Sequence, residues 1–304
     1  MPRIPRVPPT RHVPRISRIF PCEWSKRLAG LVALLALTGA DAGCTALRHD
    51  AAVAEGARIA AAGGLSPRLI AAGRFDLTAY QRLGNGGGKL VVYIEGDGIA
   101  WINRSQLSDD PTPSDPMALR LAAQDDTPDV LYLARPCQFV TGASARNCAP
   151  RYWSEARFAP EVVEAADRAV DLVKAEARQA RIELVGYSGG GVLATLLAAR
   201  RNDVVRVITV AANLDLSSWA AYHHVTPLSQ SLNPTDAAAA LAHVPQVILV
   251  GTRDEVVPPA LIEHYRAAFP ADAPITIVPV AGFSHECCWS ERWPALLRET
   301  RALP

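Results

Sequence analysis

Ser188 has the sequence setting of a nucleophilic serine. It lies in Gly186-Tyr187-Ser188-Gly189-Gly190, a Gly-x-Ser-x-Gly pattern that follows the apolar run 182–187 and precedes apolar residues at helical spacing. A tight strand-to-helix turn would expose the serine hydroxyl at a helix N-terminus, where backbone N–H groups favour negative charge. Glycines at 186 and 190 would let strand and helix approach closely. The bare pattern also arises by chance, so its strand-and-helix setting is what indicates a nucleophile elbow.

A serine hydroxyl needs a base to take its proton, and histidine is the usual one. Of the seven histidines, only His285 lies in a loop directly after the last expected strand, at 275–280. We therefore predict His285 as the base, the alternative being an ordinary surface histidine. The other histidines fall in the N-terminal segments, in an insertion, before a strand or on a helix: His12, His49, His223, His224, His243 and His264.

Asp254 is the predicted carboxylate that orients this histidine. It follows the expected strand 246–250 directly, in Gly251-Thr252-Arg253-Asp254, so it should lie at the same sheet edge as Ser188 and His285. One alternative is that Asp254 only caps the helix that starts near residue 259. Another is that Asp215, which follows the preceding strand, serves as the acid.

An acyl-transfer site also needs two N–H donors for the oxyanion of a tetrahedral intermediate. Gly189, the residue after the serine, is the first predicted donor. The second is expected from Glu95-Gly96-Asp97-Gly98, which follows the expected strand 89–94. The Asp97 N–H is the leading candidate and the Gly98 N–H the alternative. The competing interpretation is a plain tight turn.

Length and composition fit one α/β domain without nucleic-acid binding. The 304 residues suffice for one large core, and the formal net charge is only +1. The glycines at 84–88 are not a phosphate-binding loop, because they precede a strand and Leu90 stands where Ser or Thr should bind magnesium. We predict a hairpin loop there. No cofactor is predicted.

Residues 1–44 are predicted to be an export segment. Arg and Lys residues precede the apolar run Leu28–Ala40, which is too short for a membrane span but suits a signal peptide. Ala40-Asp41-Ala42 fits ordinary cleavage, whereas Gly43-Cys44 resembles the end of a bacterial lipobox, apart from Asp41. We favour lipidation of Cys44, which otherwise lacks a purpose. Either route places the protein outside the cytoplasm, in the periplasm or attached to the membrane through Cys44.

Disulfides are plausible for the six cysteines of an exported chain. Cys137 and Cys148 are the first choice for a pair. Cys287 and Cys288 are predicted to bridge each other or to pair elsewhere, since the four cysteines left in a lipidated mature chain allow three pairings. A metal site from His285, Cys287 and Cys288 is disfavoured because the spacing is too tight. No metal is predicted.

Aromatic residues near the predicted site leave one further alternative open. They either line a pocket for an acyl group or belong to the ordinary core. The residues are Trp101, Trp219, Tyr222 and Trp289.

The chain alternates apolar strands with amphipathic helices, which predicts a mostly parallel, doubly wound sheet covered on both faces. The domain is expected at residues 75–304, with a short helical cap at about 214–243, and residues 45–74 as a helix or tether ending near Gly63. The expected strands are 75–82, 89–94, 130–134, 182–187, 204–211, 246–250 and 275–280, and the main helices 117–124, 160–178, 190–200, 259–269 and 291–301.

Three segments together resemble the catalytic segments of the α/β-hydrolase superfamily, in particular its exported bacterial serine hydrolases. They are GYSGG, GTRDEVVPP and GFSH, in the expected order. The resemblance covers about residues 75–304 and implies an eight-stranded sheet, a short cap and hydrolysis of a small-molecule carboxylic ester or related acyl bond. Glu95-Gly96-Asp97-Gly98 departs from the more usual His-Gly. Two alternatives stay open: a non-catalytic envelope binding lipoprotein, and a peptidase or acyltransferase with the same triad.

Overall fold

The computed structural model describes residues 37–84 and 88–303, with side chains from residue 45 onward. The chain divides into two compact units, residues 1–44 and 45–304. In the first unit, only the backbone at the start of helix α1 (Leu37–Ala62) is described, so most of the predicted export segment and the Cys44 side chain lie outside the described residues. Within the described ranges, none of the helices has both the length and the apolarity to cross a bilayer.

Eight strands of the second unit form one sheet in the order β1-β2-β6-β3-β7-β8-β9-β10. The strands from β6 to β10 in this order are parallel, and β1 and β2 add an antiparallel edge. The strands are β1 (Ser66–Ala72), β2 (Phe75–Arg82), β3 (Leu90–Ile94), β6 (Val130–Leu133), β7 (Ile182–Tyr187), β8 (Val204–Val210), β9 (Gln246–Gly251) and β10 (Ile275–Val280).

Two expectations for the N-terminal half were wrong. Residues 66–72, expected to belong to a helix or tether, form β1, whose seven residues pair with β2. The domain therefore begins before residue 75. The glycines at 84–88 do not close a hairpin, because β6 lies between β2 and β3 in the sheet; residues 85–87 themselves are outside the described residues. Alternation in Ser66–Ala72 is weak, which is why the sequence pattern misses this edge strand.

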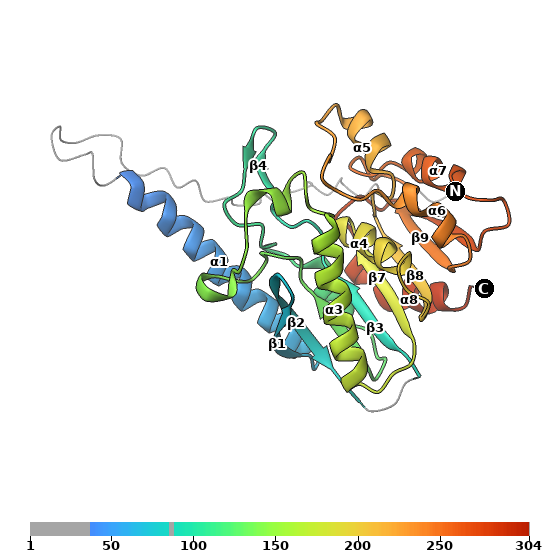
Figure 1. Cartoon of the computed structure of the whole chain (residues 1–304), viewed down its shortest axis with the longest axis horizontal. Coiled ribbons are helices and arrows are strands. Elements are labelled where there is room, and N and C mark those ends of the chain that lie inside the picture. Colours follow the sequence, from blue (N-terminus) through green and yellow to red (C-terminus); the bar gives the residue numbers. More distant parts are fainter. Residues whose placement is uncertain (1–36, 85–87, 304) are drawn as a thin grey trace, which may run out of the picture. The chain divides into compact units, whose positions relative to one another are not determined.

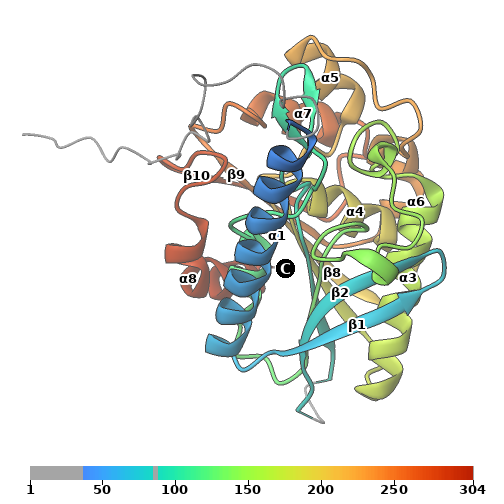
Figure 2. The same cartoon turned by 90° about the vertical axis from the view of Figure 1, so that its left-hand side faces the viewer.

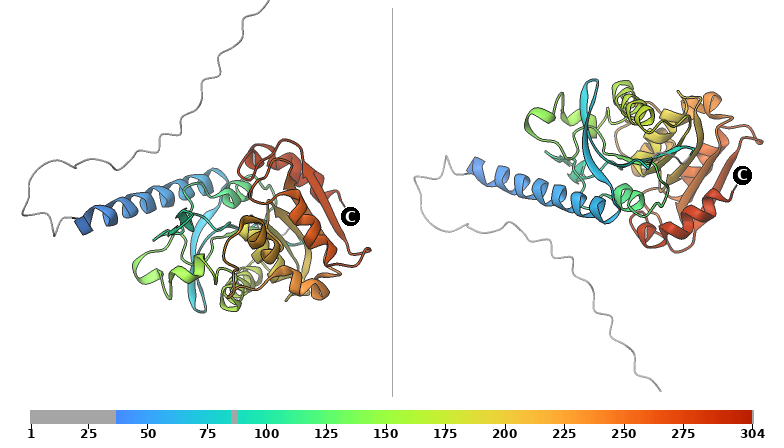
Figure 3. Two further views of the ribbon diagram at one scale, coloured as in Figure 1. Left: turned by 90° about the horizontal axis from the view of Figure 1, so that it is seen from above. Right: turned by 90° about the horizontal axis from the view of Figure 1, so that it is seen from below.

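Helices cover both faces of the sheet (Figures 1 and 2). One face packs against α3 (Pro160–Glu176), α4 (Gly189–Ala198) and α7 (Pro259–Ala267), and the other against α1, α2 (Met117–Ala122) and α8 (Trp289–Arg301). Figure 3 shows α3 and α8 on opposite sides of the strands. Strand β3 explains this arrangement: its buried side chains alternate between the two cores, so both of its faces must be covered.

Two insertions interrupt the alternation of strands and helices. The segment after β3 carries a small hairpin of β4 (Trp101–Asn103) and β5 (Gln106–Leu107), where a plain loop was expected. The segment between β8 and β9 holds α5 (Leu216–His223), a 3₁₀ turn at Pro234–Ala237 and α6 (Ala238–Leu241). This segment occupies the range expected for the cap, and its 3₁₀ turn packs against α4. Short 3₁₀ helices also lie at Gly142–Ser144 and Pro150–Trp153.

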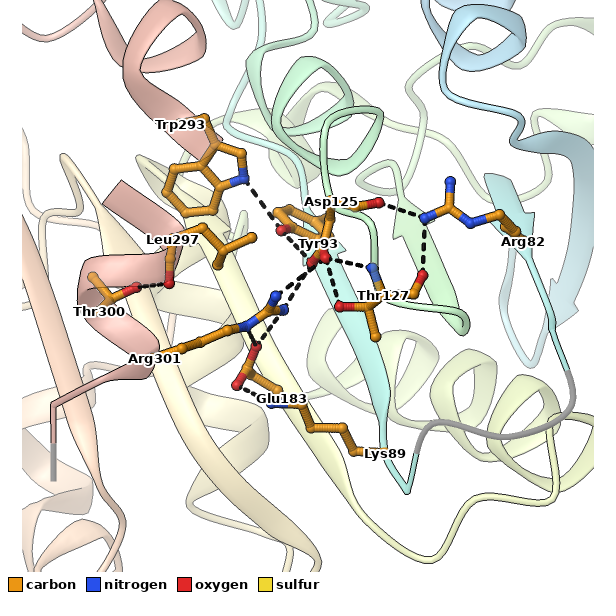
Figure 4. Close-up of polar contacts among 10 residues, drawn as sticks. All are labelled: Arg82, Lys89, Tyr93, Asp125, Thr127, Glu183, Trp293, Leu297, Thr300 and Arg301. Carbon is orange, nitrogen blue, oxygen red and sulfur yellow. Dashed lines mark hydrogen bonds and ion pairs between the residues drawn. The ribbon is translucent and has the colours of Figure 1, made fainter. Parts of the chain in front are cut away.

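A buried ionic network ties α8 to the sheet (Figure 4). Arg301 near the end of α8 donates to Asp125 Oδ2 at 2.8 Å and to Glu183 Oε1 at 2.9 Å. Both carboxylates are almost completely buried. Lys89 also contacts Glu183, at 2.5 Å, and the Tyr93 hydroxyl donates to Asp125 at 2.8 Å. Burial raises the pKa of Asp125, but the hydrogen bonds and charge of Arg301 outweigh this and leave the pKa below its ordinary value.

Replacing Arg301 tests this network. We expect Arg301→Met to lower the free energy of unfolding by about 3 kcal/mol, because it leaves two buried carboxylates short of a counter-ion. Lys89 still neutralises part of the charge on Glu183, so the loss should stay near the lower end of the usual range. Urea unfolding measures the difference. The matched control is Arg58→Met, which breaks an exposed ion pair with Glu55 and should change stability little. Equal effects of the two variants would contradict the prediction.

Candidate active site

Ser188 lies at the turn between β7 and α4, in a backbone conformation that serine rarely adopts. Its φ is 50° and its ψ −122°. The turn is tight enough to exclude side chains at the flanking glycines: a Cβ on Gly186 would stand 2.3 Å from the Gly190 carbonyl oxygen. A Cβ on Gly190 would stand 2.1 Å from the Ile94 carbonyl oxygen of the neighbouring strand. A strained serine held by such packing is the geometry of a nucleophile elbow.

The structure brings Ser188, His285 and Asp254 together. His285 Nε2 lies 3.1 Å from Ser188 Oγ, and His285 Nδ1 lies 2.9 Å from Asp254 Oδ2. The three residues follow β7, β10 and β9, whose carboxyl ends share one edge of the sheet. With Nδ1–H donating to the carboxylate, Nε2 is free to accept the serine proton.

Asp254 is held so that one oxygen faces the imidazole. Its Oδ1 accepts the backbone N–H groups of Val256 at 2.9 Å and Val257 at 2.7 Å, which leaves Oδ2 for His285. Asp215, the alternative acid, has a different partner set. Its carboxylate caps α5 by accepting the backbone N–H groups of Ser217 and Ser218 and the Ser218 hydroxyl. The structure therefore pairs His285 with Asp254.

Two aromatic residues support the backbone of His285, and the sequence patterns did not reveal this role. The His285 carbonyl oxygen accepts the Tyr187 hydroxyl at 3.1 Å and Trp289 Nε1–H at 2.9 Å. Tyr187 is the residue before Ser188, so the elbow and the histidine loop are joined directly. Trp289 is fully buried and packs edge-on against Phe283, so it belongs to the core. Of the other pocket candidates, Trp101 and Tyr222 are exposed.

The loop after β3 lies directly against the elbow. A Cβ on Gly96 would stand 3.5 Å from Ser188 Cβ, and a Cβ on Gly189 would stand 2.1 Å from Asp97 Oδ1. Gly189 is the first residue of α4, so its N–H has no acceptor within the helix. Gly98 has a φ of 65° and is pressed against the Pro111 carbonyl oxygen. Of the predicted oxyanion residues, Gly189 and Asp97 thus lie at the elbow, whereas Gly98 contacts Pro111, Pro113 and Gln138.

Glu95, at the start of this loop, is a buried carboxyl group whose role the sequence did not indicate. Its Oε1 accepts the N–H groups of Gly96 at 2.9 Å and Ala118 at 3.3 Å, and its Oε2 accepts the Tyr132 hydroxyl at 3.1 Å. Burial raises the pKa of Glu95 to about 7, although these hydrogen bonds favour the carboxylate. Glu95 therefore changes charge near neutral pH, next to the residues that flank Ser188.

The cysteines whose side chains the structure describes are paired. Cys137 and Cys148, whose Cα atoms are 5.5 Å apart, are joined by a disulfide, and so are the neighbours Cys287 and Cys288. Among the residues that the structure describes, no group of three or more His, Cys, Asp or Glu side chains is arranged to hold a metal ion.

Solved structures match this architecture at low sequence identity. They include an esterase from Pyrococcus furiosus (TM-score 0.54, 15% identity, 78% of this chain and 91% of that chain) and an α/β serine hydrolase homologue from Coxiella burnetii (TM-score 0.52, 17%, 78% and 97%). The chain has the α/β-hydrolase fold. A puromycin hydrolase shares it over 38% of its own length and 78% of this chain (TM-score 0.57, 18% identity). The sequence matches no protein-family model and no curated protein.

The buried carboxyl group of Glu95 makes the stability of the folded chain depend on pH. Because the pKa of Glu95 is about 7 in the folded chain against an ordinary 4.5, folding binds a proton between these pH values. The protonated Glu95 carboxyl group therefore adds to the free energy of unfolding. This addition is complete below about pH 4.5 and is lost as the pH rises through 7. We expect the stability of the wild type relative to Glu95→Gln to fall by about 3 kcal/mol over this range.

Urea unfolding of both proteins at a series of pH values measures this difference. Glutamine keeps the acceptor for the Gly96 N–H and removes the titration, so the other titrating groups cancel in the comparison. A difference that stays constant between pH 4.5 and 7.5 would show that Glu95 does not have a raised pKa.

Proposed function

We propose that the protein is a serine hydrolase that cleaves carboxylic esters or related acyl bonds, with Ser188 as nucleophile, His285 as general base and acid, and Asp254 as the orienting carboxylate. One observation carries the proposal: the continuous chain of hydrogen bonds from Asp254 Oδ2 through both ring nitrogens of His285 to Ser188 Oγ, at 2.9 and 3.1 Å. A nucleophile, a base and an orienting acid in this order are the groups that acyl transfer needs.

The first half-reaction transfers the acyl group to the serine. Ser188 Oγ forms a bond to the carbonyl carbon while its proton moves to His285 Nε2, and Asp254 stabilises the resulting imidazolium. The carbonyl oxygen becomes an anion that the N–H groups of Gly189 and Asp97 can stabilise. The bond to the leaving alcohol then breaks, and the alcohol takes the proton from His285.

Water completes the cycle. His285 accepts a proton from a water molecule as the water oxygen attacks the acyl carbon. The bond between that carbon and Ser188 Oγ then breaks, Oγ takes the proton from His285, and the acid leaves. Every protein group in these steps belongs to the described part of the chain, and the proposal invokes no cofactor.

The place of the reaction is also proposed from the N-terminal sequence. The basic segment, the apolar run Leu28–Ala40 and Cys44 favour export, with attachment to a membrane through a lipidated Cys44. We therefore expect the protein to meet its small-molecule ester or acyl substrate outside the cytoplasm.

Ser188→Ala tests the nucleophile. We expect a fluorophosphonate probe to label the wild type and not the variant, and turnover of p-nitrophenyl acetate to fall by about four orders of magnitude or more. Ser229→Ala, which alters an exposed serine in the insertion after β8, is the matched control and should behave as wild type. Unlabelled wild type would favour a non-catalytic binding protein, and equal labelling of Ser188→Ala would assign the reaction to another residue.

A pair of substrates shows which class of acyl bond, ester or amide, the protein cleaves. Puromycin hydrolase shares the fold, so an anilide and a p-nitrophenyl ester of one acyl group should be compared directly. Partition of the acyl-enzyme between water and added alcohols or amines would reveal acyl transfer.

The identity of the acid can be tested separately from the nucleophile. We expect Asp254→Asn to lower kcat by about 10⁴-fold, because the amide favours the wrong histidine tautomer. Asp215→Asn should leave kcat unchanged, since asparagine also caps a helix. Steady-state kinetics of both variants checks this. A large loss in Asp215→Asn with little loss in Asp254→Asn would reverse the assignment.

A further inference from the structure

The loop after β3, residues 95–98, contains the predicted oxyanion donor Asp97 and is called the oxyanion loop below. Its Asp97 carboxylate is neutralised by two buried arginines. Asp97 Oδ1 accepts Arg135 Nη1–H at 2.9 Å, and Asp97 Oδ2 accepts Arg157 Nη1–H at 2.6 Å. The side chains of Arg135 and Arg157 are only 4% and 9% exposed. Burial alone would raise the pKa of Asp97, but the charges and hydrogen bonds of Arg157 and Arg135 hold it below its ordinary value. The three groups together carry one net positive charge.

This ionic cluster lies against the N-terminus of α4, next to the predicted nucleophile. Asp97 Oδ1 is so close to Gly189 that a Cβ there would stand 2.1 Å from it. Gly189 is the residue that follows Ser188 and offers an N–H without an acceptor in the helix. Like charges that lie close together in a site with little water repel each other. An unpaired Asp97 carboxylate would therefore oppose an oxyanion at this place.

A segment after β6 holds the same loop from a second direction. Gln138 Nε2–H donates to the Gly96 carbonyl oxygen at 3.0 Å, and Gln138 Oε1 accepts the Arg135 backbone N–H at 3.0 Å. Arg135 Nη2–H also donates to the Arg157 carbonyl oxygen, and its guanidinium lies 4.7 Å from the centre of the Phe158 ring. The two arginines thus fix each other as well as Asp97.

The backbone of this segment is strained, and several contacts hold it in place. Cys137 has a φ of 72° and Phe139 a φ of 57°, in the left-handed region that side chains disfavour. Cys137 is joined to Cys148, and the Phe139 N–H donates to Thr112 Oγ1 at 2.9 Å. Such strain persists only where the surroundings determine it, and it often marks functional positions.

We propose that Arg135, Gln138 and Arg157 form an oxyanion clamp: they position the loop that presents the Asp97 N–H and cancel the charge of its carboxylate, so that a developing oxyanion does not face an unpaired Asp97 carboxylate. The proposal rests on the proposed function, because it assigns positioning residues to that reaction. Arg135 and Arg157 act through Asp97 and do not touch the reacting atoms.

The clamp makes a charge-specific prediction for Arg157 and Asp97. Arg157→Met leaves the carboxylate with one counter-ion and loosens the loop, so kcat should fall about 10- to 100-fold while KM stays within twofold, because the loss is confined to the transition state. Asp97→Asn/Arg157→Met also removes the carboxylate, which in Arg157→Met keeps only Arg135 as its counter-ion, and should recover at least tenfold in kcat over Arg157→Met. Arg157→Lys, which keeps the charge, should also exceed Arg157→Met.

Arg201→Met is the matched control. Arg201 is as buried as Arg157 and binds the carboxylates of Asp167, Asp171 and Asp203, but it lies before β8, at the sheet edge opposite Ser188. Its replacement should lower stability and leave kcat unchanged. Urea unfolding of each variant shows whether the kinetics were measured on folded protein.

The outcomes separate this proposal from the proposed function. Loss of activity in Ser188→Ala together with wild-type kcat in Arg157→Met would overturn the clamp alone, and so would a double variant no faster than Arg157→Met. Parallel changes of kcat in Arg157→Met and Arg201→Met would assign Arg157 a purely structural role. If Arg157→Met does not fold, Arg157→Gln, which removes the charge and keeps a polar side chain, decides: kcat and KM equal to wild type would also overturn the clamp.

Discussion

The parallel pairing of β7, β8, β9 and β10 is the constraint on which the site depends. In a parallel sheet all carboxyl ends lie at one edge, so the turns after β7, β9 and β10 meet although they are far apart in sequence. Ser188 and His285 are separated by 97 residues in the sequence, yet Ser188 Oγ and His285 Nε2 lie 3.1 Å apart. Backbone pairing of apolar strands thus places the polar groups, and their local contacts only refine that placement.

Paired charges serve different purposes at the two edges of the sheet. Near the amino end of β7, Arg301 joins Asp125 and Glu183 and secures the last helix to the strands. At the carboxyl edge, Arg135 and Arg157 hold Asp97 beside the elbow. In both places a buried charge is tolerated because its partners are also buried and hydrogen-bonded. Only the second pairing lies where the proposed acyl transfer would develop charge, so we expect its consequences to extend beyond stability.

Strain is concentrated around the same edge. Ser188 has a positive φ at the elbow, and Cys137 and Phe139 have positive φ in the segment that contacts the oxyanion loop. Neighbouring structure enforces each of them: close glycine contacts at the elbow, and a disulfide and side-chain hydrogen bonds around residues 137–139. The rigid surroundings keep the hydroxyl, the imidazole and the loop amides in a fixed arrangement, and such preorganisation is what electrostatic stabilisation requires.

The sequence by itself determined the local features. Apolar runs, helical spacing and the Gly-x-Ser-x-Gly turn predicted most elements, the fold and the positions of Ser188, Asp254 and His285, because these signals depend on neighbours along the chain. Only the tertiary structure decided the pairing of β1 with β2, the place of β6 between β2 and β3, the burial of Trp289 and the ion pairs of Asp97 with Arg135 and Arg157. Contacts across 38 and 60 residues leave no periodic trace in the sequence, since they arise only when the sheet brings distant loops to one edge.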